Sequence, residues 1–170
     1  EVTPHHIGLT EKKLLDYNTN AKVAPPLRSQ SDRDSLISAL KDGTIDCIAT
    51  DHAPHTIEEK EGTFDIAPFG MIGLESCFGA VNKVLTKDSK ISHLELIKLL
   101  TVNPRKIMKL NQDLFKEETN AEIVIYDPNI EWKFSLENIY SKSNNSPYLN
   151  RGLKGKIEST IVKEHIASQF

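Results

Sequence analysis

The sequence predicts an α/β fold that ends in a small β subdomain, and three observations support this. A capped helical segment, 31–43, runs directly into a short apolar run with β-branched residues, 45–50. Further segments with helical spacing follow. From about residue 114 the pattern changes to short β-type runs separated by Asn, Pro, Gly and Ser clusters. We therefore expect one domain over residues 1–113 and a small β subdomain over residues 114–170.

The first predicted helix spans residues 31–43. Ser31 is placed to cap it, Asp34 stands three residues further on, and Gly43 marks its end. The strand predicted at 45–50 is short and mostly apolar, which is typical of a parallel strand covered on both faces. This strand ends at Asp51, so we expect chemistry at its C-terminal end.

Three more helices are predicted after that strand. Apolar residues at helical spacing mark the segment 74–86, Ser92 with Glu95 opens the next helix, and Asn103-Pro104 opens the last. The β-type runs that follow are 121–126, 132–134 and 156–162.

Composition narrows the class of protein. The 170 residues are 38% hydrophobic and 26% charged, and 21 basic and 24 acidic residues give a net charge of -3. No run of Lys or Arg is long enough to suggest a nucleic-acid or membrane surface. We therefore expect a small-molecule ligand or a protein partner, with no nucleic acid and no membrane.

The two cysteines, Cys47 and Cys77, stand alone inside apolar stretches. Without a CxxC pattern they indicate buried thiols in a reducing cytoplasm rather than a disulfide. The chain has no apolar span of membrane length, and its first residues are neither a signal peptide nor a start methionine. We expect it to begin within a longer protein.

The segment that carries chemistry is Thr50-Asp51-His52-Ala53-Pro54-His55. An aspartate at the mouth of a buried strand can ligate Zn²⁺ or transfer a proton, and two imidazoles follow within four residues. On spacing alone, an ordinary explanation stays open: Asp51 caps the next turn, and His52 and His55 are plain loop residues.

A longer series of motifs resembles the dihydroorotase branch of the cyclic amidohydrolases, of the multifunctional or bacterial class I type. The landmarks are Glu1-Val2-Thr3-Pro4-His5-His6, Pro25-Pro26-Leu27-Arg28-Ser29, Asp42-Gly43-Thr44-Ile45-Asp46, the segment 50–55, Pro68-Phe69-Gly70 and Gly73-Leu74-Glu75. The second histidine of the central motif, His55, favours this family over the related hydantoinases and allantoinases, which stay as alternatives.

This resemblance implies the C-terminal part of a (β/α)₈ TIM barrel followed by a small β-sandwich subdomain built from both chain ends. It implies that Asp51 ligates one metal of a zinc pair and acts as the general acid/base. His55 and the Phe69-Gly70 backbone would hold the substrate carboxylate and ring amide. Phe69 could instead be a core residue. The implied reaction is the reversible hydrolysis of dihydroorotate to N-carbamoyl-L-aspartate in pyrimidine biosynthesis.

Other candidate residues are weighed against this site. We expect His5 and His6 to shape the rim rather than bind metal, and Arg28 to form an ion pair as readily as to touch an anionic substrate. His93 and His165 are expected on the surface.

The sequence departs from the family pattern at several points. It has no His-x-His, and a lone Asp51 cannot hold a zinc pair, so we expect these residues to be inactive alone and to need the missing N-terminal part of the protein. Ala24 stands where most relatives carry a substrate-binding Asn. This raises the alternative of an inactive homologue that serves as a structural partner of aspartate carbamoyltransferase. The resemblance also implies a homodimer.

Overall fold

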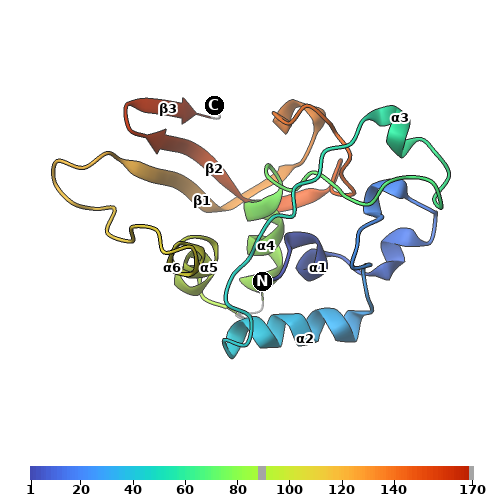
Figure 1. The fold of residues 1–170 in the computed structure, drawn as a ribbon, viewed down its shortest axis with the longest axis horizontal. Helices are drawn as coiled ribbons and strands as arrows, with labels where there is room; N and C mark the ends of the chain where they lie inside the picture. The colour runs from blue at the N-terminus through green and yellow to red at the C-terminus, as the bar shows by residue number, and fades with distance from the viewer. Residues whose placement is uncertain (88–90, 169–170) are drawn as a thin grey trace.

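Helices and an antiparallel sheet form two layers in the computed structural model, which describes residues 1–87 and 91–168 (Figure 1). The helices are α1 (Pro4–Gly8), α2 (Gln30–Lys41), α3 (Ile57–Lys60), α4 (Cys77–Leu85), α5 (His93–Leu100) and α6 (Val102–Ile107). The strands are β1 (Glu122–Lys133), β2 (Gly152–Val162) and β3 (His165–Ser168), in the order β1-β2-β3. Helix α4 lies between the sheet and α1.

Helix α2 confirms the first predicted helix but not its cap. The cap is Ser29 instead of Ser31: the Ser29 hydroxyl accepts a hydrogen bond from Asp32 N (3.2 Å), and the Asp32 carboxylate accepts one from Ser29 N (3.1 Å). Ser29 has extended backbone angles, as a capping residue requires, whereas Ser31 already lies in the helix. Asp34 therefore plays no part in the cap.

The remaining predicted helices are present with shifted starts. Helix α4 begins three residues later than the predicted 74–86, because residues 74–76 form a turn. The Ser92–Glu95 capping box of α5 is confirmed. Helix α6 begins at Val102, so Pro104 falls within its first turn, where its missing N–H is tolerated.

The prediction of a strand at 45–50 is wrong as to secondary structure. Only Ile48 makes a β-bridge there, with Val2, and a second isolated parallel bridge joins His52 to Met71. A strand needs a continuous ladder, and each of these segments meets its neighbour at a single point. The predicted burial holds for Cys47 and Ile48, which are 6% and 5% exposed, whereas Asp46 is exposed and the other three residues are only partly buried.

The β region is more continuous than predicted. The runs 121–126 and 132–134 belong to one irregular strand, β1, whose pairing with β2 shifts register between Ile125 and Tyr126 and again between Asp127 and Glu131. Phe134 lies just beyond this strand. Strand β2 begins four residues before the predicted 156, and β3 was not predicted.

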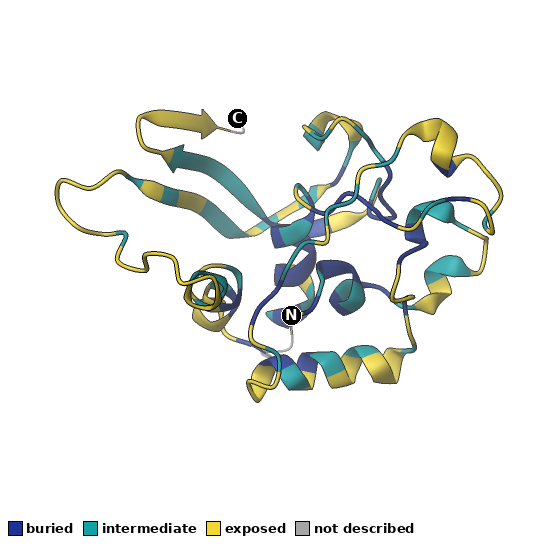
Figure 2. Ribbon diagram, viewed as in Figure 1, coloured by how far each residue is buried: buried dark blue, intermediate teal, exposed yellow. Residues whose placement is uncertain are grey.

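Two buried clusters hold the layers together (Figure 2). One joins α2, α4 and α5 to Val2 and Ile48, and the other joins Ala21 and Met71 to Phe134 and Leu153. Hydrogen bonds also join the two layers, because the Asn82 amide of α4 donates to Lys154 O (2.8 Å) and Pro128 O (3.0 Å). The domain boundary near residue 114 stays a prediction.

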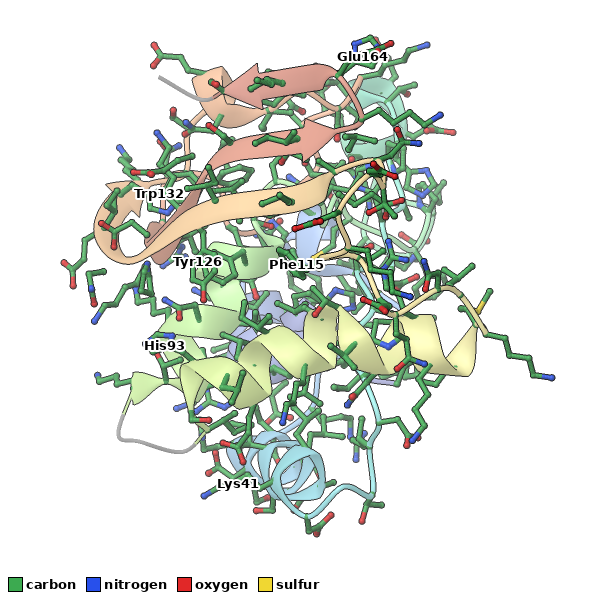
Figure 3. All side chains as sticks on the ribbon, turned by 90° about the vertical axis from the view of Figure 1, so that its left-hand side faces the viewer. Lys41, His93, Phe115, Tyr126, Trp132 and Glu164 are labelled. Atoms are coloured by element: carbon green, nitrogen blue, oxygen red, sulfur yellow. The ribbon has the colours of Figure 1, made fainter. Side chains whose placement is uncertain are left out.

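One apolar groove remains open between α5, α6 and the sheet, with a volume of about 710 Å³. In Figure 3, Phe115 and Tyr126 lie between the helical layer and the sheet. Phe115 is 85% exposed, which is unusual for so large an apolar side chain. The groove is lined mainly by side chains of α5, β1 and β2, among them Ile97, Leu100 and Ile157.

The structure also tests the predictions about the cysteines and about two surface histidines. Cys47 and Cys77 are free thiols, as expected, and burial raises the pKa of Cys77 to about 12. His93 and His165 are exposed, as expected. Within residues 1–87 and 91–168, none of the helices is long and apolar enough to cross a membrane.

Candidate active site

Asp51 sits in a strained backbone conformation between the two isolated bridges. Its φ is +49°, in the left-handed region that residues other than glycine rarely adopt. Its side chain is half-exposed, and its Oδ2 lies 3.8 Å from Nε2 of His5. Strain of this kind persists only where neighbouring structure imposes it, and it concentrates at functional positions. The carboxylate is therefore presented at the surface by a backbone that is held from both sides.

His5 is the buried neighbour of that carboxylate. It is 1% exposed, and its Nε2 has no hydrogen-bond partner among the described residues. Burial, followed by the nearby His6, lowers the pKa of His5 to about 3, so the ring is neutral at physiological pH. The sequence did not indicate this pairing, because 46 positions separate the two residues and no spacing pattern joins them.

His6 joins two parts of the chain near Asp51, and its expected role at a barrel rim stays a prediction. Its Nδ1 lies 2.6 Å from Thr3 Oγ1, and its Nε2 lies 2.9 Å from Pro25 O. Because a carbonyl oxygen only accepts, Nε2 carries the proton. The ring therefore connects the start of α1 to the Pro25 loop, which contains the exposed Ala24.

His55 faces a second loop rather than Asp51. Its Nε2 donates to Phe69 O (2.9 Å), and its Nδ1 lies 3.4 Å from the Glu59 carboxylate. Glu59 itself closes the capping box of α3 with Thr56. A hydrogen bond from the Thr56 backbone N–H lowers the pKa of the Glu59 carboxyl, and the contact with His55 lowers it further. The imidazole is thus held in one orientation by two elements.

The His52 ring contacts the backbone at Gly73. Its Nδ1 accepts a hydrogen bond from Gly73 N (3.1 Å), so the neutral ring carries its proton on Nε2. This contact fixes the segment 50–55 against the turn that precedes α4.

Gly70 allows a close approach that no other residue could make. Its φ is +128°, and an added Cβ would lie 2.6 Å from the Ala53 Cβ and 3.1 Å from His55 Nε2. The neighbouring Phe69 is 57% exposed, so its interpretation as a core residue is wrong. The structure therefore brings His55, Phe69 and Gly70 together, with Asp51 on the same segment as His55.

A buried asparagine, Asn145, joins the two loops of the site. Its side-chain oxygen accepts from His55 N (3.1 Å), and its amide donates to Ala53 O (3.0 Å) and Gly70 O (3.3 Å). Its backbone oxygen accepts from Ile72 N (3.0 Å). The sequence did not single out Asn145, since it lies within a polar stretch that looks like an ordinary loop.

Two buried lysines lie beneath the Phe69 loop. Lys22 is 8% exposed and Lys60 is 6% exposed. Burial, followed by the charge of Lys22, lowers the pKa of Lys60 to about 8. The Lys22 ammonium lies 4.6 Å from the centre of the Phe69 ring, within the range of a cation–π contact.

The described residues do not gather enough metal ligands in one place to form a centre. Within the part of the chain that the structure describes, no group of three His, Cys, Asp or Glu side chains could hold a metal ion. Asp51 can supply one ligand at most, as the sequence indicated. Arg28 lies 3.6 Å from the Asp32 carboxylate on the exposed surface, which favours the ion-pair explanation for that residue.

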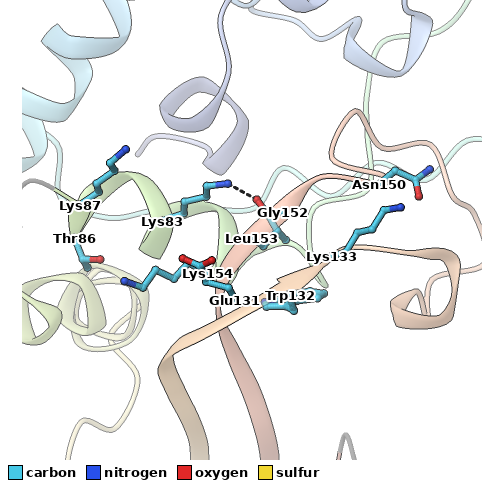
Figure 4. A pocket seen from close by; sticks show the side chains of 10 residues that line it. All are labelled: Lys83, Thr86, Lys87, Glu131, Trp132, Lys133, Asn150, Gly152, Leu153 and Lys154. Carbon is cyan, nitrogen blue, oxygen red and sulfur yellow. Dashed lines mark hydrogen bonds between the residues drawn. The ribbon is translucent and has the colours of Figure 1, made fainter.

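A separate hollow of about 630 Å³ lies where α4 meets β1 and β2 (Figure 4). Four lysines line it: Lys83, Lys87, Lys133 and Lys154. Lys83 Nζ donates to Gly152 O (2.5 Å), and the four side chains point in different directions. None of the predicted site residues lines this hollow.

Comparison with known sequences gives relatives over nearly the whole chain. It is 47% identical over 162 residues to a dihydroorotase of Elusimicrobium minutum, which is 95% of this chain and 38% of that protein. It is 44% identical over 166 residues to a dihydroorotase of Clostridium acetobutylicum and 45% identical over 170 residues to one of Endomicrobium trichonymphae. The chain spans about 38–40% of the length of these three relatives. No protein-family model matches.

Solved structures share the fold. An L-hydantoinase of Arthrobacter aurescens superimposes with a TM-score of 0.88 at 23% identity, over 98% of this chain and 38% of that chain. A dihydroorotase of Saccharomyces cerevisiae in complex with 5-fluoroorotic acid superimposes with a TM-score of 0.73 at 14% identity, over 99% and 43% of the two chains. At these identities the likeness concerns the fold alone.

Proposed function

This chain is a homologue of the dihydroorotases, and from that premise we propose that the protein containing it catalyses the reversible hydrolysis of dihydroorotate to N-carbamoyl-L-aspartate. The observation that carries the proposal is the identity of 43–47% to proteins of that name over 95–99% of the chain. Hydantoinases resemble the chain in fold, at 19–23% identity among those with TM-scores of 0.84 or more. The sequence relationship therefore favours dihydroorotate over other cyclic amides.

Asp51 is the proposed general acid/base. Its half-exposed carboxylate can receive a proton from the attacking water and return it to the ring nitrogen as the amide bond breaks. The left-handed backbone at Asp51 directs the carboxylate to this position, with the buried, neutral His5 beside it. A neutral neighbour adds no charge that would compete with proton transfer.

His55, Phe69 and Gly70 form the proposed substrate site. Because Nε2 already donates to Phe69 O, Nδ1 can donate to a carboxylate only when the His55 ring is protonated, and in that form the substrate carboxylate would replace Glu59 at Nδ1. Phe69 O and Gly70 O each accept one hydrogen bond in this structure and retain a second lone pair for a ring N–H. The exposed Phe69 ring supplies an apolar wall for a flat substrate.

Zinc is proposed as the cofactor of the complete protein, with one or two ions per site. A Zn²⁺ ion would lower the pKa of a bound water and polarise the ring carbonyl. The described residues of this chain do not make a metal site by themselves, because a catalytic zinc needs about three protein ligands. We therefore propose Asp51 as one of its ligands, with the others supplied from outside the described residues.

The remainder of the protein is proposed to complete a (β/α)₈ barrel and a β-sandwich whose small domain begins near residue 114. The apolar groove between α5, α6 and the sheet supports this, since Phe115 in its lining is 85% exposed. A homodimer, association with aspartate carbamoyltransferase and a cytoplasmic location are further expectations from the family.

The role of Asp51 is tested by Asp51→Asn in the complete protein. Amide replaces carboxylate with little change in shape, so kcat should fall roughly 10²–10⁴-fold, the usual contribution of a general acid/base. The matched control is Asp46→Asn, an exposed aspartate five residues earlier, which should keep normal turnover. Near-normal kcat in Asp51→Asn would remove the assigned role.

The substrate is tested by measuring turnover of dihydroorotate, hydantoin and allantoin with added zinc. We expect kcat/KM to be highest for dihydroorotate. Preference for either other ring would replace the proposed substrate. Absence of any turnover, with measurable binding to aspartate carbamoyltransferase, would favour the inactive structural partner that Ala24 suggested.

A further inference from the structure

The loop at residues 63–70, which carries Phe69 and Gly70, buries Ala67 but leaves the larger apolar side chains of Ile66 and Phe69 exposed. Ile66 is 77% exposed and Phe69 is 57% exposed. Within the loop, Thr63 O accepts hydrogen bonds from Ile66 N (3.1 Å) and Ala67 N (2.9 Å). Those bonds shape one turn at its start but do not reach residues 68–70. Something outside the loop must therefore determine where its end lies.

The two buried lysines make that connection. Lys60 Nζ donates to Thr19 O (3.0 Å) and Pro68 O (2.8 Å), and Lys22 Nζ donates to Asp65 O (3.0 Å) and Ala67 O (2.6 Å). The Lys22 backbone oxygen also accepts from Gly70 N (2.9 Å). Three carbonyls of the loop and one of its amides are thus bound by two residues.

Burying a charged lysine side chain at positions 22 and 60 is energetically unfavourable by itself. Among the described residues, neither ammonium group has a carboxylate within salt-bridge distance. A buried charge without such a partner is unfavourable unless hydrogen bonds compensate for its lost hydration. An ammonium group offers what an apolar chain lacks, namely three donors that can bind carbonyls of separate segments at once.

The same contacts lead to His55. Lys60 is the last residue of α3, and Glu59, the residue before it, contacts the His55 ring. The four-residue helix therefore faces the imidazole through Glu59 and the end of the loop through Lys60. A shift in α3 would move both walls of the proposed substrate site together.

We propose that Lys22 and Lys60 are positioning residues of the substrate site: their buried ammonium groups bind the carbonyls of the loop at 63–70 and so place Phe69 and Gly70 against His55. This inference rests on the proposed function for its kinetic consequence. Its structural consequence, the order of the loop, stands without any activity.

The kinetic test is Lys60→Met in the complete protein, which removes the donors and keeps the length of the side chain. Substrate binding should weaken, with KM for dihydroorotate raised about tenfold and kcat changed by less than about threefold. Lys60→Gln, which keeps a single amide donor, should restore part of the loss. The control is Lys41→Met, an exposed lysine that likewise ends a helix, and it should leave KM unchanged.

The structural test is amide hydrogen exchange. In the unaltered protein, Gly70 N–H should exchange slowly, although its loop is largely exposed, because it is bound to Lys22 O. In Lys60→Met, exchange across residues 63–70 should accelerate while that of α2 and α4 stays the same.

Fast exchange at Gly70 in the unaltered protein overturns the inference, even if neither Lys60 variant folds. An unchanged KM together with unchanged loop exchange in Lys60→Met overturns it as well. A protein without dihydroorotase activity would contradict the proposed function, and loop exchange would still decide the role of the lysines.

Discussion

Gly70 shows how strongly a single residue can constrain the site. Its positive φ and its contact with Ala53 and His55 leave no space for a Cβ atom. Gly43 offers a useful contrast, because it also has a positive φ, +81°, but an added Cβ would meet nothing within 4 Å. Comparing substitutions at the two glycines therefore distinguishes the effect of backbone strain from the effect of steric overlap.

We predict that Gly70→Ala destabilises the complete protein by roughly 2–5 kcal/mol, since strain and overlap act together. Gly43→Ala should cost about 1–2 kcal/mol, from strain alone. Denaturant unfolding of both variants measures the difference. Equal losses would show that the loops adjust and that the close approach of Gly70 to His55 has no energetic weight.

At the same scale, some residues were predictable and others were not. Asp51, His55, Phe69 and Gly70 were indicated by motif, and the structure brings the last three together. Asn145 was not indicated, because the side-chain hydrogen bonds by which it joins the two loops reach residues 75 to 92 positions away. The roles assigned to the predicted residues in substrate binding and catalysis stay proposals.

At the scale of the element, helix α2 shows the limit of reading caps from sequence. Both Ser29 and Ser31 have an aspartate three residues further on, so either could close a capping box. The structure selects Ser29 because the chain is still extended there and already helical at Ser31. The position of the cap therefore depends on the path of the preceding loop at Pro25.

We predict that Ser29→Ala destabilises the protein by about 1 kcal/mol, the usual contribution of a capping hydroxyl. Ser31→Ala should change stability by less than about 0.5 kcal/mol, because Ser31 lies in the first turn and is exposed. Thermal unfolding of the two variants makes the comparison. A larger loss from Ser31→Ala would return the cap to its predicted position.

The segment 45–50 shows a similar limit in predicting strands from sequence. Residues 45–50 have the composition of a buried strand, and Cys47 and Ile48 are buried, yet the segment forms only one bridge and Asp46 is exposed. Secondary structure in a sheet depends on a neighbour, whereas burial depends on apolar character. Composition therefore predicted the environment of the segment better than its hydrogen bonding.

At the scale of the whole molecule, Asn145 connects parts that lie far apart in the chain. Its side chain satisfies groups on the segments 50–55 and 68–72 from within the stretch 141–150, and it is 2% exposed. Removing this side chain would leave buried backbone groups of both loops without partners. The organisation of the site thus depends on a segment beyond the predicted domain boundary.

We predict that Asn145→Ala destabilises the complete protein by roughly 2–4 kcal/mol and raises KM for dihydroorotate. The adjacent Asn144 is a matched control, since no hydrogen bond of its side chain is seen in the described structure, and Asn144→Ala should cost about 0.5 kcal/mol or less. Unfolding and steady-state kinetics measure both effects. Equal behaviour of the two variants would show that Asn145 does not join the loops.

By itself, the sequence determined the family relationship, the buried segments, most of the helices and the motif that contains Asp51 and His55. These features depend on local composition, spacing and the order of short motifs, all of which are present in the linear chain. Tertiary structure alone decided that His5 faces Asp51, that Asn145 joins the two loops and that Lys22 and Lys60 hold the loop at 63–70. Those contacts join residues from 8 to 92 positions apart through buried polar groups, whose partners depend on how the elements pack.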